Sequence, residues 1–387
     1  MNSKKYVFSQ LVDFLPQRVF DTIASRYEGN KYVRHFSCWN QLLCMIFGQL
    51  ANTDSLRDLI VVLNAHSRKS YHLGLGKSVT RSNLAKANES RNYRIFEDFA
   101  YHLIGIAQKK LTDKEFEIKG RIYAFDSSTI DLCLSVFWWA TFRRKKAGIK
   151  LHTLYDVITQ IPAFIHITEA AVNDVNAMDV IPYEAEAYYV FDRGYIDFTR
   201  LYRITLRDAW FVVRAKSNLK FNRMYSEKVD RTTGILCDQV GNLSGVHTSK
   251  QYPAKLRRVK FYDAETMKTF VFLTNNMDLT SLQIALLYKN RWQVELFFKW
   301  IKQHLKIKSF WGTTENAVRI QIYSAIITYC LVTLMGADLK AKQSTYEILQ
   351  IISVSLLDKM PLNELLTNKD NKNVKEQFSN QLTINWI

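Results

Sequence analysis

The sequence lacks the cysteine and histidine arrangements that disulfide frameworks and zinc sites require. Its 387 residues include five cysteines, an odd number, and none of them has the C-x-x-C spacing. The eight histidines show no H-E-x-x-H and no paired Cys/His spacing. These absences disfavour a disulfide framework, a zinc knuckle and zinc-dependent hydrolysis, and they fit a reducing compartment.

Three further absences narrow the class of protein. No Gly-x-x-x-x-Gly-Lys-[Ser/Thr] loop occurs, so a nucleoside triphosphate is not expected as the energy source. The first residues, MNSKKYVFSQLVDFLPQ, contain too many polar residues for the apolar region of a signal peptide. The most apolar stretch, residues 320–336, is 17 residues long and includes Gln321, Ser324 and two threonines, which favours a buried core helix over a membrane span.

What the sequence does have is apolar content and positive charge. Hydrophobic residues make up 48% of the chain, which indicates a globular protein rather than a disordered one. The 53 Lys and Arg exceed the 36 Asp and Glu, giving a net charge of +17. This surplus favours a polyanionic partner, above all nucleic acid, although a basic protein without such a partner stays open on charge alone.

Residues 1–115 are predicted to be helical. WNQLLCMIFGQL and SLRDLIVVLNAH carry apolar residues at three- and four-residue steps, and a small basic helix then precedes a longer amphipathic one. This pair is compatible with a helix-turn-helix that turns Arg81, Lys86 and Arg91 toward DNA. An ordinary helical bundle with a solvated basic face is the alternative, and the residues alone favour it.

The pattern changes near residue 120 to short β-branched and aromatic runs separated by helix-compatible segments. The order is β-β-β-α-β-α-β, which predicts an α/β layer fold over residues 116–216 and again from residue 276 to 340. Residues 217–275 carry turn signals and a hairpin pattern, LRRVKFYDAETMKTFVFLTNN, so they are predicted to form a β-rich insertion. The remainder, 341–387, is expected to be a helical region that ends in a solvated Lys- and Asn-rich stretch, and no internal repeat is found.

The stretch YKNRWQVELFFKWIK sets one acid among several cations. On a helix, one face would carry Tyr288, Arg291, Glu295, Lys299 and Lys302, and the opposite face would be apolar. A surface ion pair between Arg291 and Glu295 is the simple explanation, worth a few tenths of a kcal/mol. It does not account for three cations beside one acid, whereas a nucleic-acid backbone would supply the missing negative charge.

Two aspartates at predicted strand ends, Asp126 and Asp192, are natural partners for Glu295. Each of them alone is compatible with a turn residue or a helix N-cap. Together, the three carboxylates fit two divalent ions and phosphoryl transfer. The competing acids are less favourably placed, and they are Asp131, Asp156, Asp174 and Asp179.

The residues just described resemble the insertion-sequence-four type DDE transposases. The spacing Tyr288-x2-Arg291-x3-Glu295-x6-Lys302 matches the Y-R-E-K signature of that family, and FDRGY resembles its D-x-G-Y pattern. The resemblance covers most of the chain. It implies a ribonuclease H-like mixed sheet, a β-rich insertion between the second and third acids, and a preceding helical domain that binds DNA ends.

The resemblance also implies an activity and its partners. Such enzymes cut double-stranded DNA at terminal inverted repeats and join the 3′ ends to target DNA, through a hairpin intermediate in relatives with this signature. Asp126, Asp192 and Glu295 would bind two Mg²⁺ ions, which Mn²⁺ can replace. A homodimer would work in the bacterial cytoplasm at the nucleoid, with no membrane involved, and residues 341–387 would serve dimerisation.

Roles for individual DNA contacts follow from the same resemblance. Tyr288, Arg291 and Lys302 would touch phosphates near the scissile bond, with Lys299 beside them. Trp292 would stack on an unpaired base during hairpin formation, although core packing explains it equally well. The clusters RRKKAGIK (143–150) and KLRRVK (255–260) would follow the DNA backbone or form solvated faces. A nuclease of the same fold that does not join strands, and a non-catalytic DNA-binding derivative, remain the alternatives.

Overall fold

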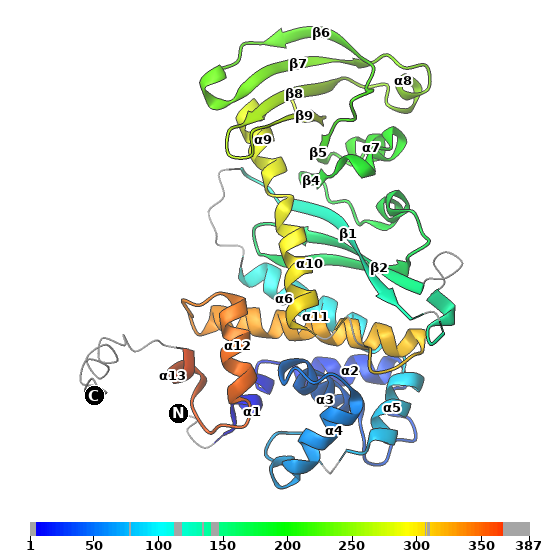
Figure 1. The fold of residues 1–387 in the computed structure, drawn as a ribbon, viewed down its shortest axis with the longest axis vertical. Helices are drawn as coiled ribbons and strands as arrows, with labels where there is room; N and C mark the ends of the chain where they lie inside the picture. Colours follow the sequence, from blue (N-terminus) through cyan, green and yellow to red (C-terminus); the bar gives the residue numbers. More distant parts are fainter. Residues whose placement is uncertain are drawn as a thin grey trace, which may run out of the picture. The chain divides into compact units, whose positions relative to one another are not determined.

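The protein is described by a computed structural model in two compact units, drawn in Figure 1. The described residues are 5–76, 79–111, 118–133, 135–140, 147–305, 307 and 310–366. One unit is helical and comprises Met1–Phe99, His304–Trp311 and Ile320–Ile387. The other contains the sheet and comprises Ala100–Gln303 and Gly312–Arg319.

The helical unit is organised around α3 (Cys38–Leu50), in which every residue except Asn40 is buried. A helix that is apolar on all sides needs neighbours all round, and several other helices provide them. Ser37 and Asn40 cap its start with reciprocal hydrogen bonds. The other helices that lie wholly or partly in this unit are α1 (Val7–Val12), α2 (Gln17–Arg26), α4 (Leu56–Ala65), α5 (Arg81–Ser90), α6 (Arg94–Lys110), α11 (Glu315–Asp338), α12 (Thr345–Ser355) and α13 (Leu362–Leu366).

One described helix, α11, is long and apolar enough to cross a membrane. Most of its apolar window is nevertheless buried inside the protein. This burial agrees with the core helix that the polar residues within residues 320–336 predict.

The second unit holds a single mixed sheet of nine strands, in the order β3-β2-β1-β4-β5-β9-β8-β7-β6. The first three strands form an antiparallel meander, as the sequence predicts. β1 then pairs in parallel with β4, and β4 in parallel with β5. The strands are β1 (Ile122–Leu132), β2 (Ala147–Asp156), β3 (Ile161–Glu169), β4 (Tyr188–Phe191), β5 (Trp210–Arg214), β6 (Phe221–Glu227), β7 (Ile235–Leu243), β8 (Leu256–Asp263) and β9 (Lys268–Thr274).

The predicted element order is confirmed from β1 to β5, with one change of type. The first predicted helix is the 3-10 helix η3 (Asp174–Val180), and the second is α7 (Phe198–Thr205). The LRRVKFYDAETMKTFVFLTNN hairpin is also confirmed, as β8 and β9. The strands between the two predicted sheet segments extend the same sheet, because β9 pairs antiparallel with β5. That pairing joins residues about 60 positions apart in the chain (Val212 with Thr274), which no local pattern reveals.

Aromatic side chains fill the core beneath β1, β4 and β5. Phe125, Phe191 and Phe211 are fully buried there, and α7 adds Leu201. α9 (Ser281–Lys289) packs against β4, β5, β8 and β9, and α10 (Trp292–His304) follows it. This packing holds the ends of β1 and β4 in place.

A buried histidine on β2 makes this unit sensitive to acid. His152 is fully buried, its Nε2 lies 2.9 Å from the Thr168 hydroxyl, and burial lowers the pKa of its imidazole to about 4. Since the unfolded chain has the ordinary value of about 6.5, it binds more protons than the folded chain between these two pH values. The stability contributed by the neutral ring is therefore present above pH 6.5 and is lost as the pH falls toward 4.

We expect this histidine to dominate the loss of stability in mild acid. Relative to His152→Gln, the wild-type free energy of unfolding should fall by about 2 kcal/mol between pH 7 and pH 5. Urea unfolding of both proteins at the two pH values measures the difference. If the free energies of unfolding of the two proteins differ by the same amount at pH 7 and at pH 5, His152 does not cause the acid sensitivity.

Candidate active site

The first two candidate acids follow paired positions on neighbouring parallel strands. The parallel register of β1 and β4 ends with Phe125 opposite Phe191, and the next residues are Asp126 and Asp192. Neighbouring strands lie about 5 Å apart, so the two backbones place these carboxylates side by side. The β1 strand itself continues to Leu132 through its pairing with β2, which corrects the prediction that Asp126 ends its strand.

The stretch from Tyr288 to Lys302 is not one continuous helix, contrary to the prediction. α9 ends at Lys289 and α10 begins at Trp292. Across the break and into the first turn of α10, the N–H groups of Arg291, Gln293 and Val294 each donate to the carbonyl three residues earlier, a tighter turn than in an α-helix. The apolar face of α10 is buried as predicted, through Val294, Phe297 and Ile301, and Leu305 just after the helix is buried too.

This break lets Arg291 join two of the candidate acids. Its guanidinium donates from Nη1 to Asp126 Oδ2 at 3.0 Å and from Nη2 to Glu295 Oε1 at 2.6 Å. The Arg291 side chain is only 13% exposed, so both bonds form in a poorly hydrated place where charge pairs act strongly. Arg291 is thus an internal bridge as well as part of the signature.

The charges of Glu295 and Asp192 affect the ionisation of Asp126. Burial, with smaller contributions from the charges of Glu295 and Asp192, raises the pKa of the Asp126 carboxyl to about 6, against the opposing effects of the Ser127 N–H and the Arg291 guanidinium. A buried carboxyl whose pKa is raised beside two further acids is typical of a functional site.

The donor set fits a divalent cation in chemical type. Carboxylate oxygens are the ligands that Mg²⁺ prefers, and these three come from β1, the end of β4 and α10. Among the described residues, however, no three His, Cys, Asp or Glu side chains are arranged to hold a metal ion. Arg291 explains this, because its guanidinium occupies the position between Asp126 and Glu295.

Tyr288, on α9, contacts the third candidate acid, Asp192. Its hydroxyl donates to Asp192 Oδ1 at 3.1 Å, and its ring lies 4.6 Å from the ring of Phe272. Burial raises the pKa of this phenol to about 12, so the tyrosine stays protonated and able to donate. It therefore orients Asp192 in the way that Arg291 orients the other two acids.

A cavity of about 370 Å³ opens beside these hydrogen-bonded side chains. Asp192, Tyr288 and Arg291 line it together with Trp292, which begins α10 and is 56% exposed. Core packing therefore does not account for Trp292. The other walls include Arg214, whose guanidinium lies 5.0 Å from the ring of Phe270, and Phe272. Arg214, Phe270 and Phe272 are not predicted from the sequence, since nothing in their local pattern distinguishes them from ordinary strand residues.

The remaining lysines of the signature region differ in their surroundings. Lys302 Nζ donates to the Thr129 carbonyl of β1 at 2.7 Å, so it also ties α10 to the sheet. Lys299 is exposed on α10 and makes no ion pair with any residue that the structure describes. Arg81 and Lys86 lie exposed on α5 in the helical unit.

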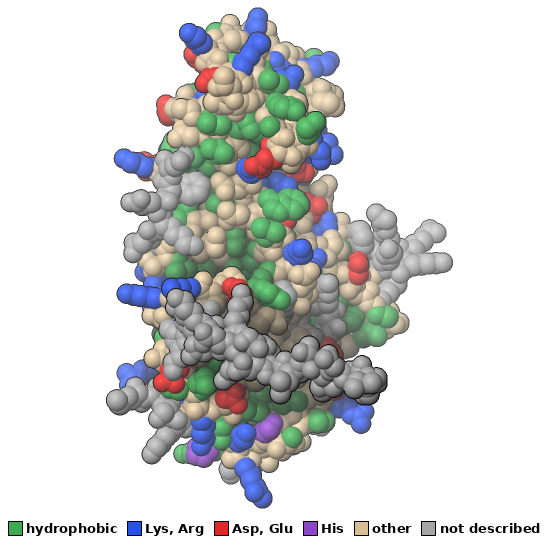
Figure 2. Space-filling view, turned by 60° about the vertical axis from the view of Figure 1, so that its left-hand side comes forward, with side chains coloured by type: hydrophobic (Ala, Val, Ile, Leu, Met, Phe, Trp, Pro, Cys, Tyr) green, Lys and Arg blue, Asp and Glu red, His purple; other side chains and the backbone are tan. Residues whose placement is uncertain are grey.

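The two basic clusters do not form uniform stripes. Residues 143–146 of the first lie outside the described part, and Lys150 binds Asp174 at 3.1 Å. In the second, Arg257 is buried against Asp238, which corrects the prediction that KLRRVK follows DNA or a solvated face throughout. On the face seen in Figure 2, Lys and Arg are scattered among neutral side chains rather than gathered in one patch.

Three of the four competing acids have structural partners instead. Asp156 accepts from the N–H groups of Ile158 and Thr159, and Asp179 binds Arg200 and Arg203. Asp174 accepts from the Ser127 hydroxyl at 2.8 Å, one residue from Asp126. Asp131 is exposed on β1.

Known proteins with similar sequences identify the family of this chain. Residues 117–331 match the family described as Transposase DDE domain, and residues 3–76 match a domain of unknown function. A protein of Sinorhizobium fredii named as transposase y4zB is 38% identical over 64% of this chain and 69% of its own. A Geobacillus stearothermophilus protein, named as a transposase for the insertion sequence element IS5377, is 29% identical over 67% of this chain and 63% of its own.

A solved piggyBac transposase synaptic complex with hairpin DNA covers 97% of this chain and 84% of its own, with 13% identity and a TM-score of 0.43, which is too distant to establish the fold. The family match does not depend on it. The chain belongs to the DDE transposase family, as its signature predicts. Enzymes of this family depend on divalent metal ions, which the carboxylate donor set suits.

Proposed function

We propose that this protein cuts DNA at the terminal inverted repeats of an insertion sequence and joins the freed 3′ ends to target DNA. One observation carries the proposal. Asp126 and Asp192 follow paired positions on β1 and β4, and Arg291 ties Glu295 to the first of them. The antiparallel meander followed by parallel strands supports the ribonuclease H-like arrangement that the family resemblance implies.

We infer that Asp126, Asp192 and Glu295 hold two Mg²⁺ ions, or Mn²⁺ in their place. When bound, the ions would lower the pKa of the attacking water or 3′-hydroxyl and stabilise the leaving oxygen. Arg291 has to release Asp126 and Glu295 for these acids to bind a cation. The released guanidinium then suits a bidentate contact with a DNA phosphate.

The cavity beside Asp192 supports the proposal of a hairpin intermediate. Trp292 offers an exposed aromatic face next to the acids, and stacking on such a face stabilises an unpaired base. Lys299 and Lys302 would contact phosphates further along α10. We propose the domain roles in the same terms: 1–115 for DNA ends, 116–216 with 276–340 for catalysis, 217–275 as the insertion, and 341–387 for a homodimer.

A cleavage and joining assay tests the function. The substrate is a duplex that carries the inverted repeats expected in the DNA flanking the gene, with a supercoiled plasmid as target. Purified protein with Mg²⁺ should cut at the repeat ends and produce joined plasmid, and EDTA should abolish both products. Cutting without joining would identify a nuclease, and binding without cutting would identify a non-catalytic derivative.

A further inference from the structure

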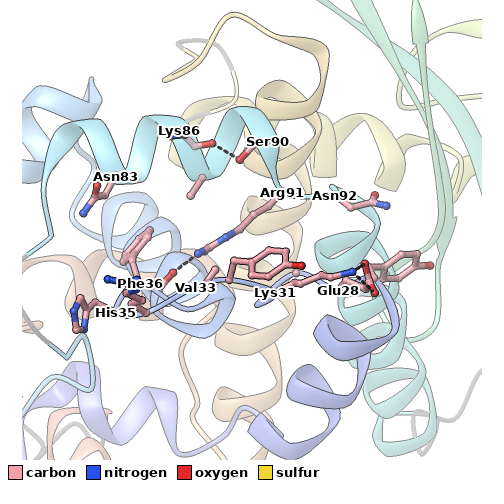
Figure 3. A pocket seen from close by; sticks show the side chains of 15 residues that line it. Glu28, Lys31, Val33, His35, Phe36, Asn83, Lys86, Ser90, Arg91 and Asn92 are labelled. Atoms are coloured by element: carbon pink, nitrogen blue, oxygen red, sulfur yellow. Dashed lines mark hydrogen bonds and ion pairs between the residues drawn. The ribbon is translucent and has the colours of Figure 1, made fainter.

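The helical unit contains a groove of about 570 Å³ between α5 and the segment that precedes α3 (Figure 3). Residues from 27 to 36 form one wall, and residues from 83 to 92 form the other. The first wall belongs to the part of the chain that matches a domain of unknown function. The groove contains neither Asp126, Asp192 nor Glu295.

The charged side chains that line this groove are mostly positive. Its four cationic side chains face a single acid, Glu28, which Lys31 already binds at 2.9 Å. Arg34, His35 and Lys86 are exposed and make no ion pair within the described ranges. The full cationic set is Lys31, Arg34, Lys86 and Arg91. Exposed cations such as Arg34 and Lys86, held together on facing walls, are the usual feature of a surface that binds a polyanion.

The two walls are fixed to each other by Arg91, at the end of α5. Its guanidinium donates to the carbonyl of Ser37 at 2.9 Å, to Gln41 Oε1 at 3.0 Å and to the carbonyl of Phe36, and it lies 5.3 Å from the Phe36 ring. Figure 3 shows this side chain crossing from α5 to the opposite wall. Arg91 therefore builds the groove, and it does not face DNA as the helix-turn-helix alternative would have it.

Polar and aromatic side chains complete the lining. Asn83 and Asn92 offer amide N–H donors, which commonly bind phosphate oxygens. Tyr32 is 94% exposed, with a positive φ of 59°, so its ring stands out from the wall toward solvent. Cations on both walls, with amide donors on one of them, suit an extended charged chain better than one small anion.

We propose that this groove binds the phosphodiester backbone of double-stranded DNA. The choice of DNA over other polyanions rests on the proposed function. The contacts are to phosphates, so the groove positions the duplex and does not read its bases. Arg34 and Lys86, one on each wall, carry the binding, and Lys86 agrees with the sequence-based assignment of α5 to DNA.

The experiment compares two double variants of the full-length protein by fluorescence anisotropy in EDTA. Arg34→Ala with Lys86→Ala removes the groove cations, and Arg57→Ala with Arg68→Ala removes two exposed cations of the same unit outside the groove. Labelled duplexes of repeat-end and scrambled sequence are titrated between about 50 and 200 mM salt. All four substituted residues are exposed, and circular dichroism checks that both variants are folded.

The groove variant should bind both duplexes more weakly by the same factor. Its plot of log affinity against log salt should be shallower by about 2, while the control variant keeps the wild-type slope. Equal behaviour of the two variants would overturn the proposal. So would an acidic peptide or an RNA duplex that binds more tightly than DNA and is lost only in the groove variant.

The same proteins separate this inference from the proposed function. If the wild type cuts no DNA with any divalent ion while the groove variant still loses DNA binding, the groove proposal is upheld and the proposed transposase activity is overturned. If the wild type cuts DNA and the groove variant binds it like the control variant, only the groove proposal is overturned.

Discussion

Asp192→Asn should abolish strand cleavage at the inverted-repeat ends. The substitution removes a charged oxygen ligand and keeps an acceptor for the Tyr288 hydroxyl, so the local hydrogen bond survives. A bound metal ion supplies several kcal/mol of transition-state stabilisation, so cleavage should fall by at least about 10³-fold. Gel assays of cut product over time with Mg²⁺ measure the loss.

The same loss is expected for Asp126→Asn and Glu295→Gln, because each amide removes a charged oxygen ligand. Glu295→Gln keeps an acceptor for Arg291, and Asp126→Asn keeps one for the Ser127 N–H. DNA-end affinity in EDTA should stay at the wild-type value in all three. Asp131→Asn, an exposed change on the same strand as Asp126, is the matched control and should cut normally. Retained cleavage in any one of the three variants would remove that acid from the metal site.

Arg257→Met should cost about 3–5 kcal/mol in the free energy of unfolding. Arg257 and Asp238 are 7% and 3% exposed, and they form two hydrogen bonds of 2.9 and 2.6 Å between β8 and β7. Removing the guanidinium leaves the Asp238 carboxylate buried without a partner, and that uncompensated charge causes the loss. The arginine also donates to the Leu279 carbonyl just before α9, so the site helix loses an anchor.

Two further variants identify the cause. Arg257→Met combined with Asp238→Leu should recover most of the stability, because no buried charge remains. Arg258→Met should cost only about 1 kcal/mol, since Arg258 is less buried and its partner is the neutral Gln239. Urea unfolding of the four proteins gives the comparison. A double variant as unstable as Arg257→Met would show that the buried charge is not the cause.

The candidate acids could be selected from sequence because their signals are local. A carboxylate after an apolar β-branched run is unusual in a core, and the Tyr288, Arg291, Glu295 and Lys302 spacing is specific to one family. The strands that place Asp126 and Asp192 were predictable for the same reason, since alternating burial and aromatic content act over a few residues.

The position of Arg291 was not predictable in this way. A helix drawn through Tyr288 and Lys302 assigns Arg291 to a surface pair with Glu295. The tight turn between α9 and α10 brings its guanidinium to Asp126 as well, a residue 165 positions away. Arg257 is a similar case, since a basic run looks exposed until the partner strand supplies Asp238.

By itself, the sequence determined the family and the order of the strands from β1 to β5, and it selected three candidate acids. Its patterns describe which side chains a segment carries and which face it buries. Only the tertiary structure decided that β9 joins β5 in one nine-stranded sheet, that Arg291 bridges two acids and that Arg91 closes a basic groove. Those contacts depend on chain segments far apart in sequence, whose pairing is set by the packing of the whole unit and not by any local period.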